Sequence, residues 1–171
     1  MHRNYHFVFF LLRFCISLSG GNRLVRNKGK TDISCCCGFP MSIPEEYLDL
    51  FLNPHFACVA TVNEKCLPQV TPMWIDYDVE RELIVVNTAR GRVKMRNFER
   101  TGKVALCILD SQDPYRYISI QGEVVEITEV GAVEHILELA KKYRGEDASF
   151  PLGEGEIRVK VSIRPTAVSL H

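Results

Sequence analysis

The sequence has no apolar run of membrane-spanning length and no residue spacing typical of a metal site. Residues 7–18 form an apolar stretch of twelve positions that Arg13 interrupts, whereas a spanning helix needs about 20 apolar residues. His55 and His135 lie in or next to apolar segments without a visible polar partner, so no nucleophile–base pair can be recognised. These absences argue against a membrane protein, a metal centre and catalysis by an activated side chain.

The seven cysteines also lack the paired spacing of a disulfide framework or a zinc site. Residues 35–37 are three adjacent cysteines, while Cys58 and Cys107 lie within apolar segments. A free cysteine in such a segment behaves as a small apolar side chain. We therefore expect free thiols, no bound metal and a reducing, cytoplasmic location.

A net charge of zero hides an uneven distribution along the chain. Residues 1–40 carry six Lys or Arg and one acid, and residues 41–171 carry 15 basic and 20 acidic residues. Met41 begins a segment with the features of a helix start, with Ser42 as the N-cap and Pro44 in the first turn. We expect residues 1–40 to be a disordered extension or a mis-assigned start, and residues 41–171 to be the folded domain.

The pattern of apolar residues from residue 41 onward predicts a mainly β fold with about three helices. Strands are expected at 55–62, 67–77, 82–88, 103–109, 115–127 and 156–170. Helices are expected at 44–52, 91–101 and 130–144. Gly122 is expected to mark a bulge or bend. Tight connections between six strands favour an antiparallel barrel with appended helices.

Residues 87–103 concentrate positive charge in an otherwise acidic domain. The segment holds a single acid, Glu99, and six basic residues, which are Arg90, Arg92, Lys94, Arg96, Arg100 and Lys103. Because a helix N-terminus is already positive, cations at its start favour an anion beside them. We interpret residues 90–97 as the holder of a small phosphorylated ligand. A solvated charged face is the alternative, and the acidic balance with few interleaved aromatics argues against nucleic acid.

Two further segments complete the candidate site. Gln69 and Thr71 alternate along a strand with two prolines, which suits contact with a flat heteroaromatic ring, although a plain edge strand has the same pattern. Trp74 fits either the core or the wall of a cleft. Tyr115 and Tyr117 share one face of the next segment and Arg116 the other, which indicates a dimer contact close to the ligand.

Three segments together resemble the split-barrel flavin-binding family related to pyridoxamine 5′-phosphate oxidase. They are PQVTPMWIDYD at 68–78, NTARGRVKMRNFER followed by KVAL at 87–106, and DPYRYISIQGEVVEI at 113–127. Some members of this family use the deazaflavin coenzyme F420. The resemblance implies a six-stranded antiparallel split barrel that forms homodimers, with the cofactor sites at the dimer interface.

The resemblance also implies a role for each matching position. Arg92 and Lys94 correspond to the basic pair that grips the cofactor phosphate, while the ring rests against the strand that begins at Gln69. Arg116 or Tyr117 is expected from the neighbouring subunit. The full set of expected cofactor-binding residues is Gln69, Val70, Thr71, Pro72, Asn87, Thr88, Arg92, Lys94, Asn97, Arg116 and Tyr117. No catalytic side chain is expected, because the cofactor itself carries the hydride chemistry.

These observations predict an F420-dependent oxidoreductase that transfers a hydride to a small organic substrate, with FMN as the alternative cofactor. Arg90, Arg96 and Arg100 exceed what one phosphate requires and suit the acidic oligoglutamate tail of F420. Vitamin B6 oxidation is not expected, because no Arg-containing tail follows the last strand. The alternatives are a non-catalytic carrier of flavin, deazaflavin or haem with the same fold, and an oligomeric structural protein without a nucleotide.

Overall fold

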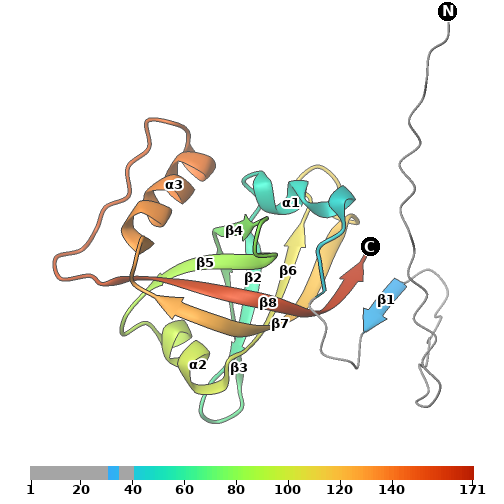
Figure 1. Ribbon diagram of the computed structural model, residues 1–171, viewed down its shortest axis with the longest axis horizontal. Helices are drawn as coiled ribbons and strands as arrows, with labels where there is room; N and C mark the ends of the chain where they lie inside the picture. Colours follow the sequence, from blue (N-terminus) through green and yellow to red (C-terminus); the bar gives the residue numbers. More distant parts are fainter. Residues whose placement is uncertain (1–30, 35–40) are drawn as a thin grey trace, which may run out of the picture.

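The computed structural model describes residues 31–34 and 41–171, which form one curled antiparallel sheet with helices at its margins (Figure 1). The strands are β1 (Thr31–Ser34), β2 (Ala57–Val62), β3 (Pro68–Met73), β4 (Ile75–Asp78), β5 (Leu83–Ala89), β6 (Lys103–Leu109), β7 (Tyr117–Thr128) and β8 (Arg158–Leu170). The helices are the 3₁₀ turn η1 (Glu45–Tyr47), α1 (Asp49–Leu52), α2 (Val93–Thr101) and α3 (Ala132–Arg144). The expected mainly β fold, a split barrel, is confirmed.

The sheet curls because two consecutive strands lie at its opposite edges. The strand order is β3-β2-β6-β7-β8-β5-β4, and β1 pairs with β8 outside this path. The single strand expected at 67–77 is therefore wrong: the chain breaks at Trp74, after which β4 pairs with β5 instead of β2. This break adds a seventh strand to the six expected. Pro68 and Pro72 fall on the edge strand β3, where a missing N–H is tolerated.

The core fills the inside of the curl. Alternate residues of β2 and β6 point inward, as the period of a strand requires, and Val59, Leu106 and Ile108 are buried. The short helix α1 closes one part of the core with Phe51, and α2 packs on β2 and β5 with Phe98 buried beneath it. Helix α3 packs beside β5 and β8. No helix in the described ranges is long and apolar enough to cross a membrane.

The element boundaries follow the sequence closely, with two corrections. The helix expected at 44–52 divides into η1 and α1, and Pro44 rather than Ser42 occupies the N-cap position, because its extended backbone (ψ 141°) delays the first helical turn. The domain boundary at residue 41 stays a prediction, since residues 1–30 and 35–40 lie outside the described part of the chain. Within that predicted extension, β1 pairs with residues 167–170 of β8.

Gly122 marks the bulge that its sequence context predicts. The register between β7 and β8 shifts between Gln121 and Gly122, and again between Val124 and Glu126. A Cβ atom on Gly122 would lie 2.6 Å from Cγ2 of Ile163 and 2.9 Å from the carbonyl oxygen of Arg164. Only glycine therefore lets β8 approach β7 this closely.

We expect Gly122→Ala to lower the free energy of unfolding by about 1–3 kcal/mol, because the Arg164 carbonyl is backbone and cannot move aside cheaply. Urea unfolding measures the change. Gly153→Ala is the matched control, because its Cβ would meet only the side chain of Glu156, at 3.3 Å from Oε2 and 3.6 Å from Cβ. Equal stability of the two variants would contradict the packing argument.

Candidate functional site

A groove of about 260 Å³ lies between β3, the end of β5 and the start of α2. Its lining residues are Gln69, Thr71, Pro72, Met73, Asn87, Thr88, Arg92, Val93 and Lys94. Seven of them belong to the set expected from the sequence to bind a cofactor. The fold thus places two segments beside one groove. The charge of residues 87–103 and the alternating pattern of the strand that begins at Gln69 each predict a ligand contact on their own.

Local backbone geometry aims each segment at the groove. On β3 the side chains at 69, 71 and 73 share the half-buried face, whereas Val70 on the other face is 59% exposed and does not line the groove. After β5, Gly91 adopts a positive φ of 79° and Arg92 is extended, so α2 begins at Val93 with its N-terminus beside the groove. That terminus has no side-chain cap and no acid in its first turn.

Lys94 is the most unusual group of the groove. Its side chain is buried, with the residue 7% exposed, and its Nζ donates a hydrogen bond to the carbonyl oxygen of Val59 at 2.8 Å. Burial lowers the pKa of this amine. No carboxylate of the described residues is within ion-pair distance of it. A buried ammonium without a counter-ion is costly, which favours an anion in the groove.

The other cations near the start of α2 differ in whether a carboxylate of the protein neutralises them. Arg90 is ion-paired with both Glu99 and Glu129, at 2.7 and 2.9 Å. It is therefore less available to a ligand than the sequence predicts. Arg92 lines the groove with one weaker ion pair, to Glu156 at 3.4 Å. Arg96 donates to the carbonyl oxygen of Gly91 and has no carboxylate partner among the described residues.

Asn87 lines the groove but is already saturated by hydrogen bonds. Its Oδ1 accepts from Nε and Nη2 of Arg158 at 2.9 and 2.5 Å. Its Nδ2 donates to the carbonyl oxygen of Ala132 at 2.7 Å and lies 3.2 Å from Nδ1 of His135. An amide has two donors and two lone pairs, so Asn87 is better suited to holding Arg158 than to binding a ligand.

Asn97 lies behind the groove. The residue is buried, and its Nδ2 donates to the hydroxyl of Thr61 at 3.0 Å and to Oε1 of Gln69 at 3.3 Å. Its own Oδ1 accepts from Arg100 at 2.7 Å. Asn97 therefore orients Gln69, which does line the groove.

Arg116 and Tyr117 do not join the groove within this chain. Arg116 forms ion pairs with Asp49 at 2.7 Å and Asp110 at 2.9 Å, and its hydrogen bond to Asp49 lowers the pKa of that carboxyl. Tyr117 stacks on His171 with ring centroids 4.1 Å apart. A role for either residue in a cofactor site requires a second copy of the chain.

The sequence analysis missed Arg158 and left open whether Trp74 belongs to the core or to the wall of a cleft. Arg158 is buried at the start of β8, bonded to Asn87 and to Glu156. Trp74 stacks on Tyr143 at 5.2 Å and meets the edge of Phe150 at 5.9 Å, next to the groove residue Met73. The sequence signal for Arg158 is its position as a charged residue at the start of an apolar strand. No local pattern in the sequence predicts that Trp74 contacts Tyr143 and Phe150.

Comparisons with known proteins identify the family and the fold. The family described as "Pyridoxamine 5'-phosphate oxidase" matches residues 43–168. A solved structure titled "F420 Reductase" superposes with a TM-score of 0.66 at 32% identity, covering 74% of this chain and 98% of that one. A search of curated proteins finds no match.

Two more distant structures share the fold alone. A conserved hypothetical protein from Mycobacterium tuberculosis has a TM-score of 0.60 and 20% identity, covering 77% of this chain and 86% of its own. A putative pyridoxamine 5′-phosphate oxidase from Lactobacillus delbrueckii has a TM-score of 0.53 and 19% identity, covering 74% of this chain and 93% of its own.

We expect Lys94→Met to raise the free energy of unfolding by about 1 kcal/mol near neutral pH, because it removes a buried charge without a counter-ion. The gain should shrink as pH rises: the pKa of Lys94 is lower in the folded than in the unfolded chain, so wild-type stability increases once the folded amine loses its proton. Urea unfolding of both proteins at neutral and alkaline pH measures this.

The control for this experiment is Lys103→Met, which removes an exposed amine that is ion-paired with Glu123. It should change stability by less than about 0.5 kcal/mol. A Lys94→Met protein less stable than wild type at neutral pH would mean that the bond to Val59 outweighs the cost of the buried charge.

Proposed function

The chain belongs to the pyridoxamine 5′-phosphate oxidase family, and from this premise we propose that it is an oxidoreductase that binds coenzyme F420, with FMN as the alternative cofactor. In this proposal the groove between β3 and α2 holds the cofactor, and a small organic molecule accepts or donates the hydride. The observation that carries the proposal is the buried ammonium of Lys94, which has no carboxylate partner among the described residues and lies in a groove lined by polar donors.

The donors of the groove suit a phosphate attached to a flat ring. Arg92, Lys94, Thr88 and the uncapped start of α2 line the groove, and they would hold the phosphate. Gln69 and Thr71 line β3, where they would contact the polar rim of the ring. When bound, a flavin or deazaflavin supplies the hydride chemistry, and the protein's part is to bind, orient and exclude water.

Two arginines favour F420 over FMN. Arg96 and Arg100 lie one helical turn apart on α2, and neither has a carboxylate partner among the described residues. FMN ends at its phosphate, whereas F420 continues into an acidic oligoglutamate tail that needs further cations. The neighbour titled "F420 Reductase", at 32% identity, supports the same choice.

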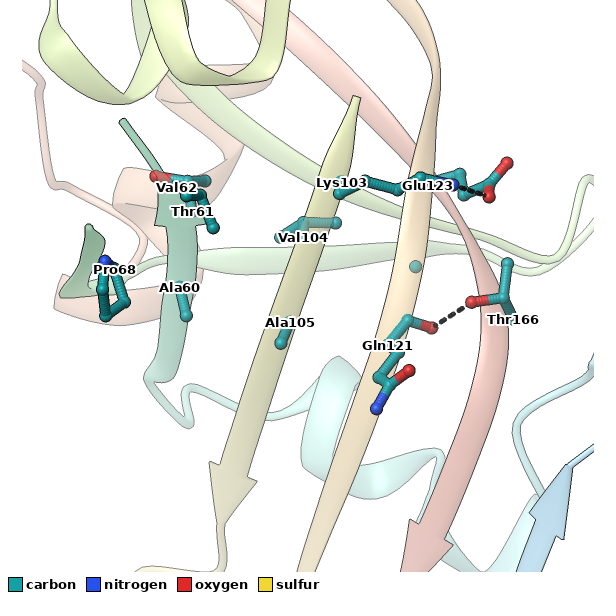
Figure 2. Close-up of a pocket in the computed structure, with 11 residues that line it drawn as sticks. Ala60, Thr61, Val62, Pro68, Lys103, Val104, Ala105, Gln121, Glu123 and Thr166 are labelled. Carbon is teal, nitrogen blue, oxygen red and sulfur yellow. Dashed lines mark hydrogen bonds and ion pairs between the residues drawn. The ribbon is translucent and has the colours of Figure 1, made fainter. Parts of the chain in front are cut away.

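A homodimer would complete the site, and the outer face of the sheet supports one. Figure 2 shows Ala60, Ala105 and Gln121 in a row across β2, β6 and β7, and they line a hollow of about 580 Å³. Val70 and Leu109 are exposed on the same face. Among the described residues that line this hollow, Lys103 is the one cation, and it is paired with Glu123, so the hollow suits a protein surface better than an anion.

The cofactor proposal is tested by titrating the full chain with F420 and with FMN, following fluorescence at low and high salt. We expect micromolar F420 binding that weakens with salt, and weaker FMN binding. Arg96→Gln should weaken F420 binding by about threefold to tenfold and leave FMN binding unchanged, because only F420 has a charged tail.

Arg81→Gln is the control for charge alone, because Arg81 is ion-paired with Glu126 away from the groove. Binding of neither cofactor would reject the proposal. Turnover of reduced cofactor with a panel of enones and quinones then separates an enzyme from a carrier, since a carrier binds without turnover.

The dimer proposal makes its own prediction: Ala105→Arg, on the outer face, should convert a dimer into monomers. Sedimentation velocity measures the mass, and cofactor affinity should fall at least tenfold if each site needs both subunits. Val133→Arg on α3, which is 38% exposed, is the control and should stay dimeric. A monomeric wild-type protein with full affinity would overturn this arrangement.

A further inference from the structure

The loop between α3 and β8 brings a carboxylate to the rim of the candidate groove. Residues 145–157 connect the two elements without regular structure, on the outer side of the barrel (Figure 1). A turn forms where the backbone N–H of Glu156 bonds to the carbonyl oxygen of Gly153 at 3.0 Å, with Gly155 at a φ of 71°. This turn places Glu156 directly before β8, opposite the start of α2.

Glu156 is held between two arginines. Its Oε1 lies 2.5 Å from Nη1 of Arg158 and 3.4 Å from Nη2 of Arg92. Arg158 is itself fixed, since its remaining donors bond to Asn87 and its guanidinium lies 5.1 Å from the ring centroid of Phe150. The carboxylate is therefore a fixed negative charge beside Arg92, and its hydrogen bond from Arg158 lowers its pKa.

This carboxylate changes the charge that the groove offers to a ligand. The cations that line the groove are Arg92 and Lys94, and Arg92 is shared with Glu156. Arg90, the next cation along the chain, is ion-paired with Glu99 and Glu129. Together with Arg158, which also shares Glu156, these four cations face three carboxylates, Glu99, Glu129 and Glu156, so a net charge of about one positive remains around the groove. That balance matches a monoanion and disfavours a dianion.

We propose that Glu156 makes the groove selective for a phosphodiester over a phosphomonoester. A phosphodiester carries one negative charge, whereas a phosphomonoester carries nearly two at neutral pH. The proposal rests on the function proposed above and deepens it: the phosphate of F420 is a diester that continues into the tail, and that of FMN is a terminal monoester. Glu156 thus determines specificity without entering the hydride chemistry.

The size of the effect follows from charge alone. A second negative charge on the ligand, within about 8 Å of Glu156 near a protein surface, is repelled strongly enough to weaken binding by about tenfold after screening by salt. A monoanion engaged by Lys94 lacks that second charge. Removal of the Glu156 charge should therefore improve FMN binding more than F420 binding.

The experiment compares dissociation constants for FMN and F420 by fluorescence titration of the full chain. The proteins are wild type, Glu156→Gln, Glu156→Asp and Glu154→Gln, the last being an exposed acid of the same loop. We expect Glu156→Gln to tighten FMN binding about tenfold and F420 binding by no more than about threefold. Glu156→Asp, which keeps the charge, and Glu154→Gln should both keep the wild-type ratio. Thermal unfolding checks that every variant is folded.

The outcomes separate this inference from the function beneath it. If wild type binds neither cofactor, the proposed function fails and the inference fails with it. A second outcome is that wild type binds F420 while Glu156→Gln weakens the binding of both cofactors or changes both affinities equally. In that case Glu156 only positions Arg92. The selectivity inference is then overturned, and the proposed function stands. Tighter binding of FMN than of F420 by wild type also overturns it.

Discussion

The break at Trp74 is the constraint from which the rest of this structure follows. Residues 68–73 pair with β2 at one edge of the sheet, and residues 75–78 pair with β5 at the other. Two adjacent segments can occupy opposite edges only if the sheet curls until those edges meet. The same curl brings β3 to the end of β5 and the start of α2, so the groove is a direct result of barrel closure. The stack of Trp74 on Tyr143 attaches this crossing to α3.

Within the groove, one charge, that of Lys94, is held at a cost to stability. Two of the cations around the groove are neutralised by the protein: Arg90 has two glutamates, and Arg158 has Glu156. Lys94 has only a backbone carbonyl. A buried ammonium in this state costs folding energy that an apolar residue would not, and the proposed anionic cofactor would offset this cost. The burial of Lys94 differs from the solvated charged face that the sequence left open as the alternative.

Much of this arrangement was predictable from the sequence, and the failures have physical causes. Strand and helix periods located most elements, and charge at a helix start located Lys94 correctly in the groove. Strand pairing is not a local property, so the separation of β3 from β4 could not be read from residues 67–77. Hydrogen-bond saturation is not local either: Asn87 reaches the groove, but Arg158, 71 residues later in the chain, occupies its carbonyl oxygen. Side chains that share a site but lie far apart in sequence remain invisible to pattern analysis.

The two faces of β3 explain why cofactor binding and assembly would be coupled. Gln69 and Thr71 face the groove, while Val70 between them points to the outer face of the sheet. Val70 does not line the groove of its own chain, yet it lies on the face that a second subunit would cover. The edge strand β3 has a hydrogen-bonded neighbour in the sheet on one side only, and packing on its outer face would hold its inner residues in place against the ring. A partner subunit would thereby shape the groove even through residues that never touch the ligand.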